Sequence, residues 1–135
     1  RMAKLVQIEG IGEAYAEKIK RMGIRSTDAL LKKGSTSQGR KELAEQSGIG
    51  EHLILEWVNR ADLFRIKGIG EEYSDLLENA GVDSVVELAQ RNAEKLLPRL
   101  QAVNRNRKLV RKMPGQGQVA NWINQAKKLP RRVTH

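Results

Sequence analysis

The sequence contains no cysteine, so disulfide bonds and thiolate-ligated metal sites are excluded. Histidine occurs only at His52 and His135, which leaves too few ligands for a typical zinc site. No apolar run approaches the roughly 20 residues that a membrane span needs, and no signal peptide is recognisable. We therefore expect a cytoplasmic protein that binds no metal and no cofactor and does not associate with membranes.

Acidic residues are absent from the last quarter of the chain. Residues 99–135 hold 10 Lys and Arg and no Asp or Glu, whereas residues 1–63 hold 11 against 9 and residues 64–98 hold 4 against 7. The formal net charge of +9 therefore comes from the carboxyl-terminal segment. Such a segment suits a polyanion such as nucleic acid. The alternative interpretation is a solvated basic tail.

The residue sets of common enzymes are also missing. The chain has no Ser-His-Asp, Cys-His or metal-ligand set, and no phosphate-binding loop that ends in Lys-Ser or Lys-Thr. Asp75 and Asp83 are explained by a solvated helix face and by helix capping. We expect no catalytic residue and no enzymatic activity.

What the chain does contain is an internal repeat. "EGIGEAYAEKIKRMGIRSTDALLK" begins at Glu9 and "KGIGEEYSDLLENAGVDSVVELAQ" begins at Lys67, with equivalent Gly, Tyr, Ser and Leu residues 58 positions apart. A constant spacing over some twenty residues indicates duplication. We expect two units, residues 1–63 and residues 64–135, the second carrying the basic segment. Because units of this size bury only ~60% of their unfolded surface, the two halves should pack against each other.

Apolar residues recur at helical spacing and no strand pattern is convincing, so an all-α fold of about ten short helices is predicted. Trp57 and Trp122 each lie on an apolar stripe, which favours a core position over base stacking. Ser84 followed by Glu87 predicts a capping box. Residues 33–39 ("KGSTSQG") are predicted to form a loop.

Gly-Ile-Gly occurs three times, and Gly115-Gln116-Gly117 is a weaker fourth case. The glycines permit a tight turn with positive φ, and the isoleucine is predicted to enter the core. The second glycine opens a helix whose free N–H groups and dipole suit a phosphate. The predicted turn glycines are Gly10, Gly12, Gly48, Gly50, Gly68 and Gly70.

These segments resemble helix-hairpin-helix motifs, a resemblance that implies DNA binding through backbone contacts to phosphates without base reading. "GVDSVVELAQRNAEKLLPRL" is also similar to part of the carboxyl-terminal domain of the bacterial RNA polymerase α subunit. The whole chain, down to "WINQAKKLPRRVTH", resembles a bacterial family of small tandem helix-hairpin-helix proteins of unknown function. The resemblance implies two helix-hairpin-helix units packed together.

The first three turns depart from the DNA-binding pattern, because Glu13, Glu51 and Glu71 follow their second glycines. A carboxylate there stabilises the helix but repels a phosphate. We interpret these three turns as structural. The fourth has no acid nearby, and the preceding segment predicts one helix with an apolar side and a basic side. The apolar side comprises Leu100, Val103, Leu109, Val110 and Met113.

Two functional hypotheses follow. The first is a sequence-nonspecific DNA-binding protein, with double-stranded DNA as the favoured nucleic acid. The second is a protein-interaction or scaffold module that keeps the hairpin fold without binding nucleic acid. RNA as the partner and the oligomeric state stay open. The predicted nucleic-acid-binding residues are Arg105, Arg107, Lys108, Arg111, Lys112, Gly115, Gly117, Gln118, Lys127, Lys128, Arg131 and Arg132.

Overall fold

The computed structural model describes residues 4–135, and over these residues the fold is all-α, as the sequence predicts. The described chain forms eight α-helices and one short 3-10 helix, slightly fewer than the ten expected, and no strand. The elements are η1 (Leu5–Gln7), α1 (Glu13–Lys20), α2 (Thr27–Gly34), α3 (Ser37–Ser47), α4 (Glu51–Leu63), α5 (Glu71–Asn79), α6 (Val85–Ala89), α7 (Ala93–Arg107) and α8 (Gln116–Lys128). None of these helices is both long enough and apolar enough to cross a bilayer.

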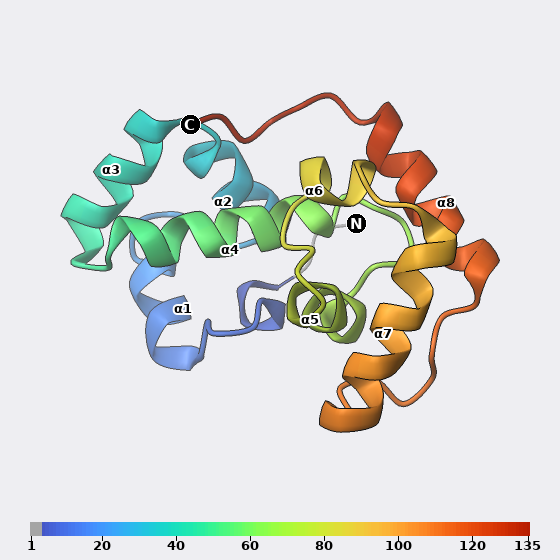
Figure 1. The fold of residues 1–135 in the computed structure, drawn as a ribbon. Helices are drawn as coiled ribbons and strands as arrows, with labels where there is room; N and C mark the ends of the chain where they lie inside the picture. Colours follow the sequence, from blue (N-terminus) through green and yellow to red (C-terminus); the bar gives the residue numbers. More distant parts are fainter. Residues whose placement is uncertain (1–3) are drawn as a thin grey trace.

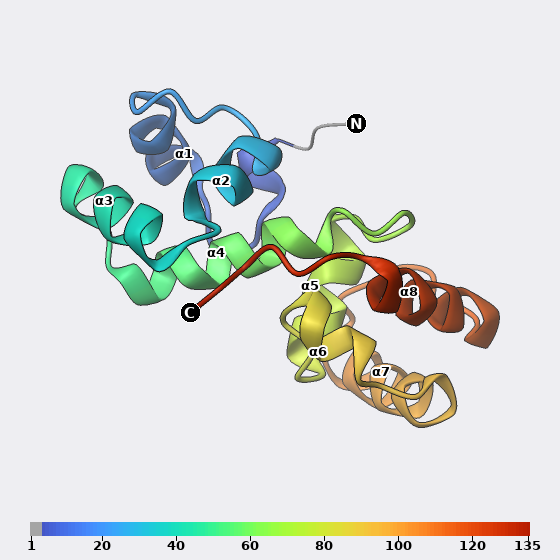
Figure 2. The same ribbon diagram turned by 90° about the horizontal axis from the view of Figure 1, so that it is seen from above.

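The buried side chains form two separate clusters. One gathers the apolar residues between Leu5 and Ala61, where α2, α3 and α4 pack on one another. The other gathers those between Leu63 and Ala126, where α7 packs on α5 and α8 packs on α6 and α7. Figures 1 and 2 show the two groups of helices side by side, with α4 running from the outer end of the first group to the junction.

A buried arginine joins the two groups at that junction. The Arg60 side chain on α4 is 5% exposed and pairs with the carboxylate of Glu78 on α5. Asp75 on the same helix lies 4.0 Å away. Because a buried charge is costly unless it is paired, this contact ties α4 to α5.

The final residues, 129–135, cross back to the first group of helices, and we call them the C-terminal strap. Figures 1 and 2 show the strap leaving α8 and ending beside α2 and α3. The Thr134 N–H donates to the Ser35 carbonyl at 2.8 Å. The Arg40 guanidinium donates to the carbonyls of Thr134 at 2.6 Å and Gly34 at 2.8 Å. Val133, only 6% exposed, is thereby buried in the first cluster.

Replacing Val133 with alanine is expected to lower the free energy of unfolding by about 1.5–2 kcal/mol, the cost of two buried carbon groups. Urea denaturation measures the effect. The matched control is Val6→Ala, because Val6 is 42% exposed and should lose little. Equal losses for the two variants would show that the strap is not held in the core.

The loop predicted over residues 33–39 is wrong. Only residues 35 and 36 separate α2 from α3. The Thr36 hydroxyl accepts a hydrogen bond from the Gly39 N–H at 3.0 Å and caps α3. A Cβ at Gly39 would lie 1.9 Å from the Lys33 carbonyl oxygen, so this glycine allows a close helix contact, not a flexible loop.

The Gly-Ile-Gly turns have the predicted local structure. Gly10 and Gly68 have φ values of 93° and 98°, and Gly48 has 75°. The central isoleucines are at most 5% exposed. The second glycines, Gly12, Gly50 and Gly70, are the N-caps of α1, α4 and α5.

Capping at Ser84 is confirmed in part. Its hydroxyl accepts a hydrogen bond from the Glu87 N–H at 3.1 Å, as the capping box predicts. The Glu87 carboxylate, however, accepts from the Arg91 side chain at 3.1 Å. Because the carboxylate pairs forward along the chain, the interaction with Ser84 is a simple serine cap.

Candidate functional site

Helix amino termini in the described chain differ in charge. Glu13, Glu51 and the pair Glu71 and Glu72 occupy the first turns of α1, α4 and α5. The first turn of α8 holds no acid, and its residues Gln116, Gly117 and Gln118 are exposed. The first backbone bond at this end runs from the Val119 N–H to the Gly115 carbonyl at 3.1 Å. The preceding N–H groups are therefore the free donors typical of a helix start.

The basic helix predicted before this turn is wrong in its extent. α7 ends at Arg107, and Lys108 adopts φ 53° and ψ 49°. The left-handed conformation stops the helix. Asn104 holds the reversal, since its amide accepts from the Val110 N–H at 2.9 Å and donates to the Val110 carbonyl at 3.2 Å. Leu109, Val110 and Met113 therefore approach the core from an irregular segment, which we call the basic loop (residues 108–115).

The fourth glycine turn also differs from the predicted form. Gly115 is the N-cap of α8, with φ −81°, and Gly117 lies inside the first turn of the helix. Pro114 is buried directly before the cap, where the other turns have isoleucine. The start of α8 is therefore open to solvent, although the turn lacks the positive-φ glycine of the other three.

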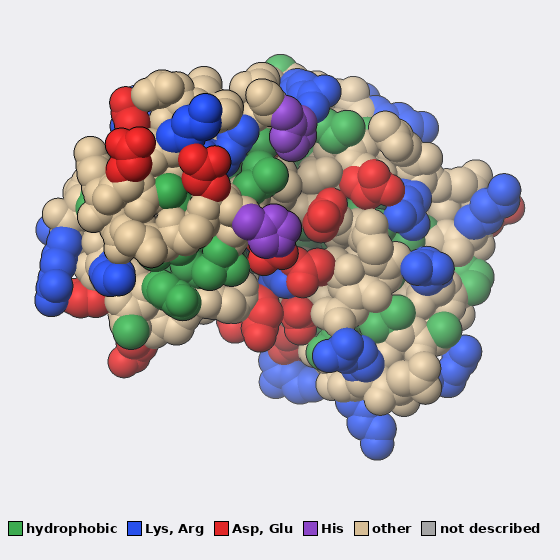
Figure 3. Space-filling view, turned by 60° about the vertical axis from the view of Figure 1, so that its left-hand side comes forward, with side chains coloured by type: hydrophobic (Ala, Val, Ile, Leu, Met, Phe, Trp, Pro, Cys, Tyr) green, Lys and Arg blue, Asp and Glu red, His purple; other side chains and the backbone are tan. Residues whose placement is uncertain are grey.

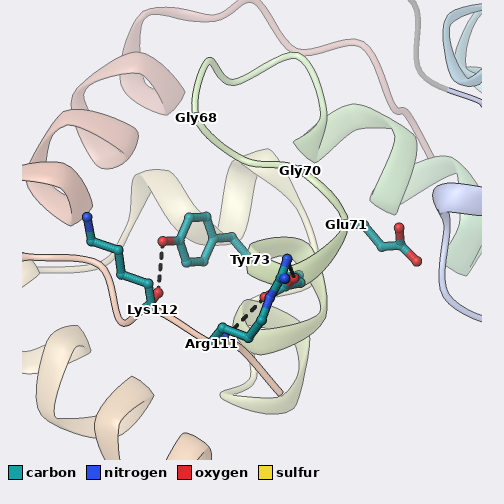
Figure 4. Close-up of a pocket in the computed structure, with 7 residues that line it drawn as sticks. Gly68, Gly70, Glu71, Tyr73, Arg111 and Lys112 are labelled. Carbon is teal, nitrogen blue, oxygen red and sulfur yellow. Dashed lines mark hydrogen bonds and ion pairs between the residues drawn. The ribbon is translucent and has the colours of Figure 1, made fainter. Parts of the chain in front are cut away.

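The basic loop leans against α5. Figure 4 shows the Tyr73 hydroxyl directed at the backbone of Lys112 and Arg111 lying against the start of α5. The Tyr73 hydroxyl donates to the Lys112 carbonyl at 2.9 Å. Glu72 accepts from the Arg111 backbone N–H at 3.2 Å and from its guanidinium at 2.9 Å. These bonds hold the pKa of Glu72 below its usual range, so its charge occupies Arg111 at neutral pH.

The predicted cations are all exposed, but the structure divides them into two sets. Gly115, with Lys112 three residues before it, marks the amino end of α8. Lys127 and Lys128 lie in its last turn, about 20 Å away at 1.5 Å per residue. The second set therefore cannot contact a phosphate bound at Gly115. The cations near the amino end are Arg105, Arg107, Lys108, Arg111 and Lys112, and those beyond the carboxyl end are Arg131 and Arg132.

Acidic side chains gather elsewhere. Figure 3 shows Asp and Glu side chains in the hollow between the two groups of helices. A pocket there is lined by Glu56, Asn59, Glu78, Gly81 and Asp83. A polyanion is repelled from this hollow, so the opposite charges of the protein occupy different parts of its surface.

Sequence reasoning missed the role of Glu72, because its partner Arg111 is 39 residues away. It also missed Gln125 on α8, whose side-chain oxygen accepts from the Lys67 N–H at 2.8 Å and whose amide donates to the Lys67 carbonyl at 3.0 Å. This bidentate contact fastens α8 to the turn before α5. The only hint in the sequence was an amide at a position where the first half has Arg60.

Replacing Glu72 with glutamine is expected to free Arg111 for an external anion. If the basic loop binds nucleic acid, affinity should rise, and the salt dependence of log affinity should steepen by about 0.9, one added phosphate contact. Fluorescence anisotropy with a short duplex at several salt concentrations measures both. Because the pKa of Glu72 is lowered, acid should act in the same direction only as pH falls through that depressed value.

Glu13→Gln is the matched control for this prediction. It removes the same charge from the first turn of α1, far from the basic loop in the chain. Equal changes in affinity for the two variants would mean that general charge, not Arg111, controls binding.

Comparison with known proteins gives one match. The family model described as "Domain of unknown function (DUF4332)" matches residues 9–129. No curated protein and no solved structure matches the chain.

Proposed function

Because the chain belongs to the DUF4332 family, whose function is unknown, we propose its function from its own geometry: it is a non-enzymatic protein that binds the phosphate backbone of duplex DNA without sequence specificity. In this proposal the chain consists of two helix-hairpin-helix units, residues 1–63 and 64–135. The basic end of the second unit carries the interface.

The two-unit organisation is supported by paired features 58 residues apart. Gly23 and Gly81 have φ values of 85° and 93° at equivalent places after α1 and α5. The Tyr15 and Trp57 rings lie 5.1 Å apart, and the Tyr73 and Trp122 rings lie at the same distance. Each tryptophan also approaches the first glycine of its own turn. Two such matching sets favour duplication over chance.

The observation that carries DNA binding is the surface around the start of α8. Residues 99–135 contain no acid, and all their Lys and Arg side chains are exposed. Among the ion pairs of the described residues, only Arg111 from this segment takes part. Exposed cations without partners beside free helix N–H groups suit phosphates, which supply most of the affinity in nonspecific binding.

The test is a titration of the wild-type protein with duplex DNA at several salt concentrations. Log affinity should fall linearly with log salt, with a slope of about −0.9 for each neutralised phosphate. Single-stranded DNA and duplex RNA are measured alongside. Absence of salt-dependent binding to any of the three, even at low salt, would exclude the proposal.

A protein-interaction role is the second candidate, and the acidic hollow favours it. Glu56, Glu78 and Asp83 line that hollow, and carboxylates occupy three of the four turn-helix starts. A basic partner protein would suit that surface. If DNA binding fails, this hypothesis takes its place.

A further inference from the structure

We propose that α8 lies in the major groove of duplex DNA, with Asn121 and Asn124 against base edges and cations at both ends of the helix on phosphates. The inference rests on the proposed function and assigns it a groove, a preferred nucleic acid and two base-contacting residues. It adds a preference for A·T base pairs to the backbone binding.

The outer face of α8 is free and carries no acid. The helix buries Val119, Trp122, Ile123 and Ala126 against the second core. The opposite face exposes Gly117, Asn121, Asn124 and Lys128, which recur at helical spacing. Figures 1 and 2 place α8 at the outer edge of the molecule, where a groove wall can reach it.

One of these amides is held in place before any ligand binds. The Gln125 side chain is fixed by the Lys67 backbone at 2.8 and 3.0 Å, and it donates to the Asn121 side-chain oxygen at 2.8 Å. The Asn121 amide nitrogen is left as a donor directed by this chain of bonds. Such ordering reduces the entropy that is lost on binding. At the equivalent place 65 residues earlier, α4 carries Glu56, which a DNA groove would repel.

The length of α8 fits a groove with a phosphate backbone on each side. The helix is about 20 Å long, and the major groove is roughly 12 Å wide. Its ends therefore extend past the groove walls, with Lys112 before one end and Lys127 and Lys128 at the other. This arrangement gives the two separated sets of cations one common partner.

The amides specify which base edge and which duplex. Asn pairs well with the N6 and N7 edge of adenine in the major groove. The major groove of A-form RNA is too deep and narrow for side chains to read. We therefore expect the partner to be B-form DNA that contains A·T pairs.

Three duplexes of equal length at one salt concentration test this inference: an A·T-rich DNA, a DNA of G·C pairs alone, and an RNA with the A·T-rich sequence. The wild-type protein should bind the first at least about fivefold more tightly than the second, the factor expected for one amide–adenine pair. It should bind the RNA about tenfold more weakly than the DNA. Asn121→Ala/Asn124→Ala should abolish the A·T preference without changing the salt slope.

Gln46→Ala is the matched control, because Gln46 is an exposed amide on α3. It should leave both the preference and the slope unchanged. Equal, salt-dependent binding to all three duplexes would overturn the inference and leave the proposed function standing, as would a preference that survives in the double variant. No binding to any duplex would overturn both.

Discussion

Replacing Trp122 with alanine is expected to lower the free energy of unfolding by about 3–5 kcal/mol, the usual cost of truncating a buried aromatic side chain. The indole is 1% exposed and packs in the second core, with the Tyr73 ring 5.1 Å away at an interplanar angle of 53°. It also lies over the Gly68 turn, where a Cβ would come within 2.9 Å of its ring nitrogen. The loss therefore removes both core volume and the support of the turn that precedes α5.

Urea denaturation followed by far-ultraviolet circular dichroism measures this loss. Trp57→Ala should cost a similar amount, because Trp57 is equally buried and packs against Tyr15. Val86→Ala is the surface control, since Val86 is 37% exposed and should change stability little. If Trp122→Ala unfolded like the wild type but bound DNA more weakly, the ring would belong to the binding face.

The second large effect is expected when four cations are removed from the region that precedes α8. Substituting Arg105, Arg107, Lys108 and Lys112 with glutamine should weaken duplex DNA binding by roughly two to three orders of magnitude at low salt, at about 1 kcal/mol per charge contact in water. The salt slope should flatten by up to about 3.6. All four side chains are exposed, so the fold should persist.

A second quadruple variant removes the same net charge from the first half. Lys18, Lys20, Arg21 and Arg25 are also exposed, and they lie in or just after α1. Their substitution by glutamine should change affinity and slope far less. Equal weakening by the two sets would mean that DNA responds only to net charge, and the assignment to the start of α8 would fail.

Features set by neighbouring residues were predictable from the sequence. The Gly-Ile-Gly turns were correctly predicted because positive φ at Gly10 and Gly68 is a local requirement, and the apolar spacing around Trp57 and Trp122 reports directly which face is buried. The serine cap at Ser84 was likewise evident, because its partner is three residues away.

Features set by distant contacts were not predictable. The apolar and basic spacing after Leu100 continues past Arg107, so only the Asn104–Val110 bonds reveal that α7 stops there. Val133 is a single apolar residue among arginines, and its burial depends on Arg40, 93 positions earlier. The Arg111–Glu72 pair likewise joins residues that only folding brings together.

The most direct test of the proposed interface is a titration of isotope-labelled wild-type protein with a short DNA duplex, followed by the backbone amide NMR signals. The largest shifts are expected at residues 116–118 and in the basic loop, with smaller ones at Lys127 and Lys128. Shifts confined to the starts of α1, α4 and α5, or no shifts at any residue, would contradict the assignment of DNA binding to the amino end of α8.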